Sequence, residues 1–212
     1  VQTTVETPDV FAPETIITGG PGDGARLCDG NATFSFTGSD DTAHVSQLQY
    51  CWRLDGGEWS AFDPATSKAF TGLKHGAHTF EVAARDPSGK VDQTPAIRSF
   101  TVDLNPPVIT GVSAVPGQSD IIVTWTTDEP ATSQVEYGTS VSLGSFTAVN
   151  TSLRTSHSMT VTGLEPDRLH YFRVRSKDAC GRESVSETAT VRTLVDTGLP
   201  DTFLTQGPGE GS

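Results

Sequence analysis

Apolar residues recur at every second position in many short segments of this sequence, as at Leu48, Tyr50, Trp52 and Leu54. No segment sustains the 3.6-residue period of an amphipathic helix. Gly, Pro, Asn and Asp separate the segments, which is typical of short strands joined by turns. Because successive side chains of a strand point to opposite faces of a sheet, this alternation predicts strands with one buried face. We therefore expect an all-β fold.

The chain of 212 residues is long enough for two domains of ordinary size. Each half of the chain fits a seven-strand immunoglobulin-like sandwich of about 100 residues. The second half is expected to include separate strands at 121–126 and 133–137. The paired prolines Pro106 and Pro107 lack amide donors and mark a boundary. The sequence thus predicts two tandem sandwiches at 13–104 and 105–195, with 1–12 ending a preceding repeat and 196–212 forming a linker and the first strand of a following repeat.

Internal repetition supports this division. Phe80-Glu-Val82-Ala-Ala-Arg85-Asp86-Pro-Ser-Gly89-Lys90 aligns without gaps on Phe172-Arg-Val174-Arg-Ser-Lys177-Asp178-Ala-Cys-Gly181-Arg182. A second repeat relates residues 13–24 to residues 200–211. We therefore expect a two-domain repeating unit within a longer periodic assembly. The last strand is expected to fray or to add to the sheet of a neighbouring copy. Its residues, with Cys180, are the candidate intermolecular contacts: Thr202, Phe203, Leu204 and Thr205.

The cysteines leave alternatives open. Cys28 and Cys51 are candidates for a disulfide bond within the first domain, although alternation places Cys51 on the face opposite Tyr50. Cys180 falls in a predicted hairpin turn, where an odd thiol in a secreted protein indicates an intermolecular disulfide or an unused cysteine. None of the spacings matches a zinc site.

Charge and motifs exclude several classes of function. The net charge of −12, from 14 basic and 26 acidic residues, disfavours nucleic acid as a partner, because its binding depends on clustered cations. No apolar run approaches the ~20 residues that a membrane-spanning helix needs. No nucleophile, zinc-protease or phosphate-loop motif is present. We expect a non-enzymatic chain that requires no cofactor.

Acidic residues in turns suggest calcium, because carboxylate and amide oxygens are the ligands that this cation prefers. One set is expected at the domain junction: Asp103, Asn105, Asp128, Glu129 and Asp178. Equivalent groups belong to the end where the chain enters the first domain: Asp40, Asp41, Asp86 and Asp92, near Glu6 and Asp9. Aspartate is also common in turns for conformational reasons alone, so turn chemistry remains an alternative to calcium.

Two family resemblances cover most of the chain. Residues 107–195 resemble a fibronectin type III domain in Ile122-Val-Thr-Trp125, in Gly163-Leu164-Glu-Pro166 and in the strand that begins at His170. The stretch 123–138 looks like the variant of this domain that is found in secreted bacterial proteins and before metallophosphoesterase domains. Residues 13–104 resemble bacterial Ig-like modules in Leu54-Asp55-Gly56-Gly57, in the Gly72 to Phe80 segment and in Asp86-x-x-Gly89-x-Val91-Asp92. These resemblances imply extracellular sandwiches with no fixed function.

Histidine stands where fibronectin-type sandwiches usually carry a corner tyrosine. His170 takes this place in the second domain and His78 in the first. Alternation directs both side chains inward, so we expect each to hydrogen-bond a main-chain group. Metal binding by His75 and His78 is the alternative.

The function indicated is a structural or adhesive repeat of an extracellular bacterial surface stalk, adhesin or filament. Its expected partners are neighbouring repeats or other copies of the chain. The alternative is a spacer or carbohydrate-binding accessory module of a large secreted enzyme.

Overall fold

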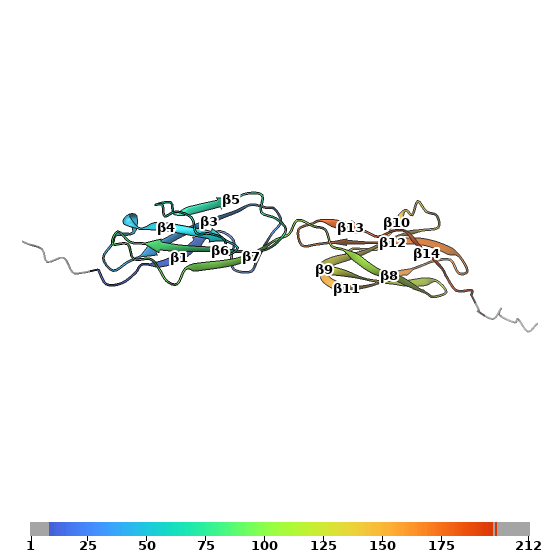
Figure 1. Ribbon diagram of the computed structural model, residues 1–212. Coiled ribbons are helices and arrows are strands. Elements are labelled where there is room, and N and C mark those ends of the chain that lie inside the picture. The colour runs from blue at the N-terminus through green and yellow to red at the C-terminus, as the bar shows by residue number, and fades with distance from the viewer. Residues whose placement is uncertain (1–8, 197, 199–212) are drawn as a thin grey trace, which may run out of the picture. The chain divides into compact units, whose positions relative to one another are not determined.

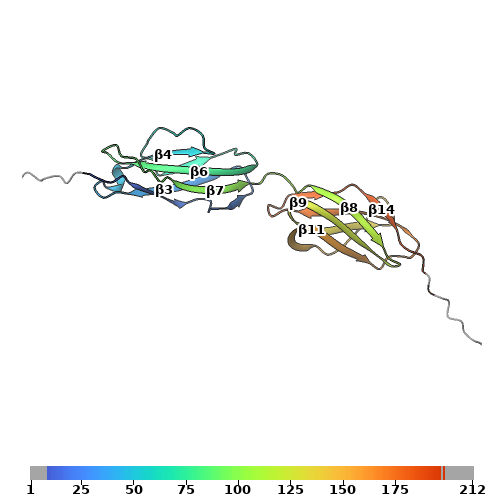
Figure 2. The same cartoon turned by 60° about the horizontal axis from the view of Figure 1, so that its bottom comes forward.

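The computed structural model describes residues 9–196 and 198, and it divides the chain into two compact units, Val1–Asn105 and Pro106–Ser212. The division falls one residue beyond the predicted boundary. Each unit is built from β-strands (Figures 1 and 2). The described residues contain a single short 3-10 helix, η1 (Val45–Gln47), and no helix with the length and apolar character needed to cross a membrane. The predicted all-β fold is confirmed.

Unit 1 is a sandwich of two sheets. The first sheet has the order β1-β3-β5, with β1 at Glu14–Gly19, β3 at Ala32–Ser39 and β5 at Ser67–Phe70. The second has the order β2-β7-β6-β4, with β2 at Ala25–Leu27, β7 at Ala96–Val102, β6 at Gly76–Arg85 and β4 at Gln49–Leu54. Strand β2, which pairs in parallel with β7, was not expected. Its three residues are too few to show alternation in the sequence.

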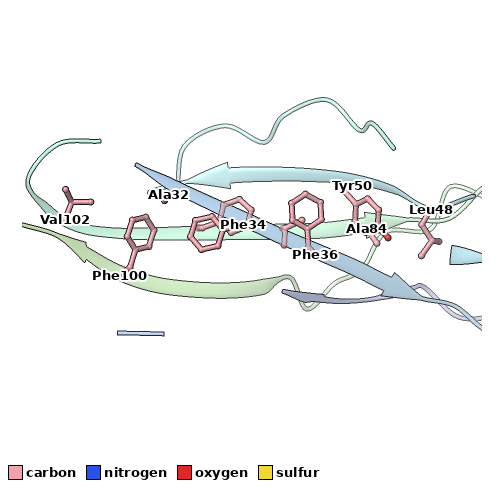
Figure 3. Packing of buried hydrophobic residues seen from close by; sticks show 10 residues of the cluster. Ala32, Phe34, Phe36, Leu48, Tyr50, Ala84, Phe100 and Val102 are labelled. Atoms are coloured by element: carbon pink, nitrogen blue, oxygen red, sulfur yellow. The ribbon is translucent and has the colours of Figure 1, made fainter. Parts of the chain in front are cut away.

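Aromatic rings fill the space between the two sheets of unit 1 (Figure 3). The rings of Phe34 on β3 and Phe80 on β6 stack at 4.3 Å with an interplanar angle of 12°. Phe36 and Tyr50 meet from opposite sheets at 5.3 Å. Each of these side chains contributes about 1.5–3 kcal/mol by leaving water, so this cluster is the main source of stability for unit 1.

Unit 2 is organised by one long strand. This strand, β9 (Asp120–Gly138), pairs with β8 (Ile109–Pro116) and β11 (Asn150–Thr162), and it also pairs with β10 (Ser145–Phe146) and β12 (Leu169–Lys177). Strands β13 (Glu183–Val185) and β14 (Ala189–Arg192) complete the pairing along β12.

The prediction of separate strands at 121–126 and 133–137 is therefore wrong. Both segments belong to β9, and Pro130 lies between them. The register of β11 against β9 shifts between Arg154 and Ser156, opposite this proline. Since proline cannot donate a ladder hydrogen bond, it is tolerated at this irregularity without ending the strand.

The core of unit 2 is formed by alternate residues of β9 and β12. Ile121, Val123 and Trp125 of β9 are buried against Phe172 and Val174 of β12. The indole Nε1–H of Trp125 donates to Ser176 Oγ at 2.9 Å, which satisfies its one polar group inside the core. Trp125 thus lies on the inward face of β9 together with Ile121 and Val123.

Candidate metal centre

A tight turn after β6 fixes the Asp86 carboxylate. The Asp86 amide donates to the Lys90 carbonyl at 3.0 Å, and the Gly89 amide donates back to the Asp86 carbonyl at 3.2 Å. Asp86 Oδ1 accepts from the Lys90 amide and from Ser88 Oγ, each at 2.9 Å. Gly89 has φ 94°, which favours glycine. Asp86 is 4% exposed, and its Oδ2 atom is buried without a hydrogen-bond partner.

The same turn follows β12 in unit 2. The Asp178 amide donates to the Arg182 carbonyl at 3.0 Å, and the Gly181 amide donates to the Asp178 carbonyl at 3.2 Å. Asp178 Oδ1 accepts from the Arg182 amide at 2.8 Å, and Gly181 has φ 81°. Asp178 Oδ2 is again buried without a partner. The residues that repeat in the sequence thus form the same backbone hydrogen bonds in both units.

Three further aspartates gather within unit 1. One carboxylate oxygen each from Asp9, Asp40 and Asp41 lies within 4.8 Å of the others. Asp40 Oδ2 caps the loop after β3, accepting from the amides of Thr42 at 3.0 Å and Ala43 at 2.7 Å. Asp40 Oδ1 and Asp9 Oδ1 are buried without partners.

Local hydrogen bonds favour the ionised form of two of these carboxylates, Asp9 and Asp40. The Lys90 ammonium lies 2.8 Å from Asp9 Oδ2, and its hydrogen bond is the largest of several that lower the pKa of Asp9. The hydroxyl of Ser88 lowers the pKa of Asp9 further, whereas burial raises it. The Ala43 amide lowers the pKa of Asp40. Asp9 and Asp40 therefore carry negative charge at neutral pH.

Of the groups expected at this end of unit 1, Asp9, Asp40 and Asp41 come together, and Asp86 adjoins Asp9. Asp92 has a different role. Its Oδ2 accepts from the Thr15 amide at 2.9 Å, and its Oδ1 accepts from the amide and hydroxyl of Thr94 at 2.8 and 2.9 Å. Asp92 is thus engaged in fastening β1. Glu6 lies outside the described residues.

The set expected at the domain junction is divided between the units. Asp103 and Asn105 belong to unit 1, whereas Asp128, Glu129 and Asp178 belong to unit 2. Asp103 Oδ2 accepts from Arg26 Nη1 at 2.6 Å, and Asp128 Oδ1 accepts from the Val108 amide at 2.7 Å. Calcium binding by this set stays a prediction.

The two corner histidines differ in how closely they approach a main-chain carbonyl. His78 Nε2 lies 2.9 Å from the Lys74 carbonyl, its Nδ1 lies 2.8 Å from Asp55 Oδ2, and its ring stacks on Phe100. His170 Nε2 lies 3.5 Å from the Glu165 carbonyl. The main-chain interpretation is confirmed for His78. The alternative of a shared metal fails, since both His78 nitrogens are engaged and His75 Nδ1 accepts from the Leu104 amide at 3.1 Å.

The cysteine predictions need correction. Cys51 is a free thiol, so the candidate disulfide between Cys28 and Cys51 is wrong. Cys51 is 4% exposed, although alternation indicated an outward position. The error arose because the outer face of β4 is itself covered at this point. Cys51 is thus a free thiol inside unit 1, and the intermolecular contact expected of Cys180 stays a prediction. The other candidate contacts, Thr202, Phe203, Leu204 and Thr205, lie outside the described residues.

A buried polar cluster in unit 2 was not anticipated. The His157 ring stacks on Trp125 at 4.9 Å and 8°. The Thr127 hydroxyl donates to the Glu129 carbonyl at 2.7 Å and therefore accepts from His157 Nε2–H at 2.9 Å. His157 Nδ1 then accepts from Ser133 Oγ at 2.7 Å. The signal in the sequence was alternation, which places His157 on the inward face with Met159 and Val161.

Comparison with known proteins bears on unit 2. A family profile described as "Purple acid Phosphatase, N-terminal domain" matches residues 109–193. These residues form a fibronectin type III-like β-sandwich. The resemblance predicted for residues 107–195 is thereby confirmed as to fold, whereas the resemblance of residues 13–104 to bacterial Ig-like modules stays a prediction.

Two further comparisons add little about function. Among solved structures, a crystal structure of chicken CNTN1 FN1-FN3 domains is 16% identical with a TM-score of 0.36, covering 86% of this chain and 68% of that chain. The search of curated proteins found no match. No activity transfers to this chain from either comparison.

Proposed function

We propose that this chain is a non-catalytic structural segment of an extracellular protein, serving as a spacer in a bacterial surface stalk, adhesin or filament. The observation that supports this role most directly is the turn built around Asp86 and repeated around Asp178, with the same backbone hydrogen bonds in both units. Duplicated structural units are typical of arrays, in which modules stack as spacers.

The interior of each unit also fits a spacer. Phe34 and Phe80 are fully buried in unit 1, as are Val123 and Val174 in unit 2, so side chains occupy the space between the sheets. Trp59 is 37% exposed, and the Arg53 guanidinium lies over its ring at 4.6 Å. A ring face covered by a cation is a poor platform for stacking a sugar.

A second candidate is an accessory module of a secreted enzyme. The match of residues 109–193 to the N-terminal domain of purple acid phosphatases favours it, because it associates unit 2 with modules that accompany a hydrolase. In both proposed functions this chain acts as a spacer between other domains, and its partners are neighbouring modules or other copies of the chain.

Light scattering and negative-stain microscopy on the purified full chain test the proposal, together with an assay of p-nitrophenyl phosphate hydrolysis with iron and zinc ions added. Fibres would identify the chain as a self-assembling filament subunit. A monodisperse monomer would identify it as a passive spacer. We expect no hydrolysis in either case. Metal-dependent turnover proportional to the concentration of the chain would refute the non-catalytic role.

A further inference from the structure

We propose that Asp9, Asp40 and Asp41, whose carboxylate oxygens gather in one group, bind a Ca²⁺ ion beside Asp86 at the end of unit 1 where β3 and β6 terminate. Asp9 precedes β1, Asp40 and Asp41 directly follow β3, and Asp86 directly follows β6. The site and the adjoining Asp86 therefore lie within a single unit and come from three separate segments of the chain.

Unpartnered oxygens distinguish this cluster from ordinary acidic turns. Asp9 Oδ1, Asp40 Oδ1 and Asp86 Oδ2 are each buried and accept no hydrogen bond. Asp86 as a whole is 4% exposed, so bulk solvent does not reach its unpartnered Oδ2 atom. A buried carboxylate oxygen without a partner costs free energy, and Asp9 and Asp40, which each carry one, belong to the same group of three carboxylates, so one cation would satisfy both.

The carboxylates already converge on one positive charge. The Lys90 ammonium interacts electrostatically with Asp9, Asp86 and Asp40. Its hydrogen bonds go to Asp9 Oδ2 at 2.8 Å and to Ser88 Oγ at 2.7 Å. One ammonium group leaves most of the charge of four carboxylates uncompensated. A divalent cation would neutralise two of the three negative charges that remain.

The ligand chemistry favours Ca²⁺ over other divalent ions. All the candidate donors are carboxylate oxygens, which suits a hard cation, whereas zinc sites draw on histidine and cysteine. Asp40 and Asp41 also line a surface pocket together with Phe11 and Pro13, so water can complete the coordination. Ca²⁺ accepts six to eight oxygens in irregular geometry, whereas Mg²⁺ demands a near-ideal octahedron.

The bound ion would fasten the segment before β1 to the loops that follow β3 and β6. Asp9 is the only one of the three candidate ligands in that segment, and its single described ion pair is the one with Lys90. Calcium would thus stabilise the end of unit 1 against unfolding. Aspartate turns with this function are consistent with a module that works outside the cell, where calcium is abundant.

Calorimetric titration of the calcium-stripped full chain with CaCl₂ tests the site. We expect wild-type binding with a dissociation constant of about 10⁻⁴ to 10⁻³ M, the range of extracellular modules. In Asp86→Asn the amide oxygen can still accept from the Lys90 amide while one charge is lost. This variant should lose one bound equivalent or weaken it at least tenfold. Asp9 lies outside every strand, and Asp9→Asn should likewise lose the bound ion or weaken its binding at least tenfold.

Asp29→Asn is the matched control, because Asp29 is exposed and lies in another loop of unit 1. It should bind calcium as the wild type does. Calcium at ten times the dissociation constant should also raise the melting temperature of unit 1 by about 5 °C in the wild type and in Asp29→Asn alone. The proposal is overturned if the wild type binds no calcium up to ~10 mM, which would make Lys90 the sufficient counterion, or if both cluster variants bind as the wild type does.

Discussion

His157 and His78 show how neighbouring groups set the charge of a histidine. Burial lowers the pKa of His157, whose ring lies against Trp125 and whose nitrogens bond hydroxyl groups. Burial acts on His78 too, but the Lys74 carbonyl and the Asp55 carboxylate outweigh it and raise the pKa of His78. The two units therefore respond differently to acid.

Acidification should destabilise unit 2 through His157. The pKa of His157 is lower in the folded unit than the ordinary unfolded value of about 6.5, so below that pH the unfolded chain binds more protons than the folded one. The free energy of unfolding of unit 2 should fall as the pH decreases from 7.5 to 5.5. This free energy can be measured by urea unfolding of the full chain, with the NMR signals of core amides such as that of Val123 reporting on unit 2.

His157→Phe supplies the comparison for this pH dependence, because it retains a ring against Trp125 and cannot titrate. Its unfolding free energy should be lower at pH 7.5 but depend less on pH. His170 in the same unit also has a pKa lowered by burial and by Arg168, so some dependence should remain. An identical slope in wild type and variant would exclude His157 as the sensor.

Sequence reasoning at the residue scale succeeded where a feature was local. The turn around Asp86 was visible because its hydrogen bonds join residues at most four positions apart. The role of Asp92 was not visible, since its partner Thr15 lies 77 positions away. Cys51 was misplaced for the same reason, because alternation distinguishes the two faces of a strand but not whether the outer face is covered.

At the scale of elements, β9 determines the architecture of unit 2. Its first part pairs with β8 and β11, and its last part with β12. Thr127 lies just before the irregular stretch at Pro130, and its hydroxyl bonds the Glu129 carbonyl and His157. We infer that Thr127 fixes the path of β9 between its two sets of partners.

Thr127→Val should destabilise unit 2 by about 1–2 kcal/mol. The substitution keeps the shape of the side chain but leaves the Glu129 carbonyl and His157 Nε2 without this partner, and Thr127 is buried. Thr124→Val, at an exposed position of the same strand, is the matched control and should change stability by less than about 0.5 kcal/mol. Urea unfolding of both variants decides the matter, and equal effects would show that the hydroxyl of Thr127 has no special role.

Strands were predictable from the sequence where buried and exposed residues alternate over several positions. The strand that begins at His170 was located in this way, since β12 alternates along most of its length. Short β2 and β13 were not, because three residues cannot establish a period. The continuity of β9 was hidden by Pro130, since a proline ordinarily indicates the end of a strand and only the register of β11 shows why this one does not.

At the scale of the whole molecule, each unit has its own core. The cluster around Phe34, Phe80 and Phe100 is drawn from unit 1, and the cluster around Trp125 and Phe172 from unit 2. Since the burial of apolar area is the main driving force of folding, two separate cores predict two separate cooperative transitions.

Phe34→Ala should therefore lower the stability of unit 1 by about 3–5 kcal/mol, because Phe34 is fully buried and contacts three other aromatic rings. Native-state hydrogen exchange on the full chain should show faster exchange at the Val82 amide of unit 1 and unchanged exchange at the Val123 amide of unit 2. Val123→Ala should give the reciprocal pattern. Parallel acceleration at both amides in either variant would show that the two cores unfold as one, and the chain would then behave as a single cooperative body instead of two serial modules.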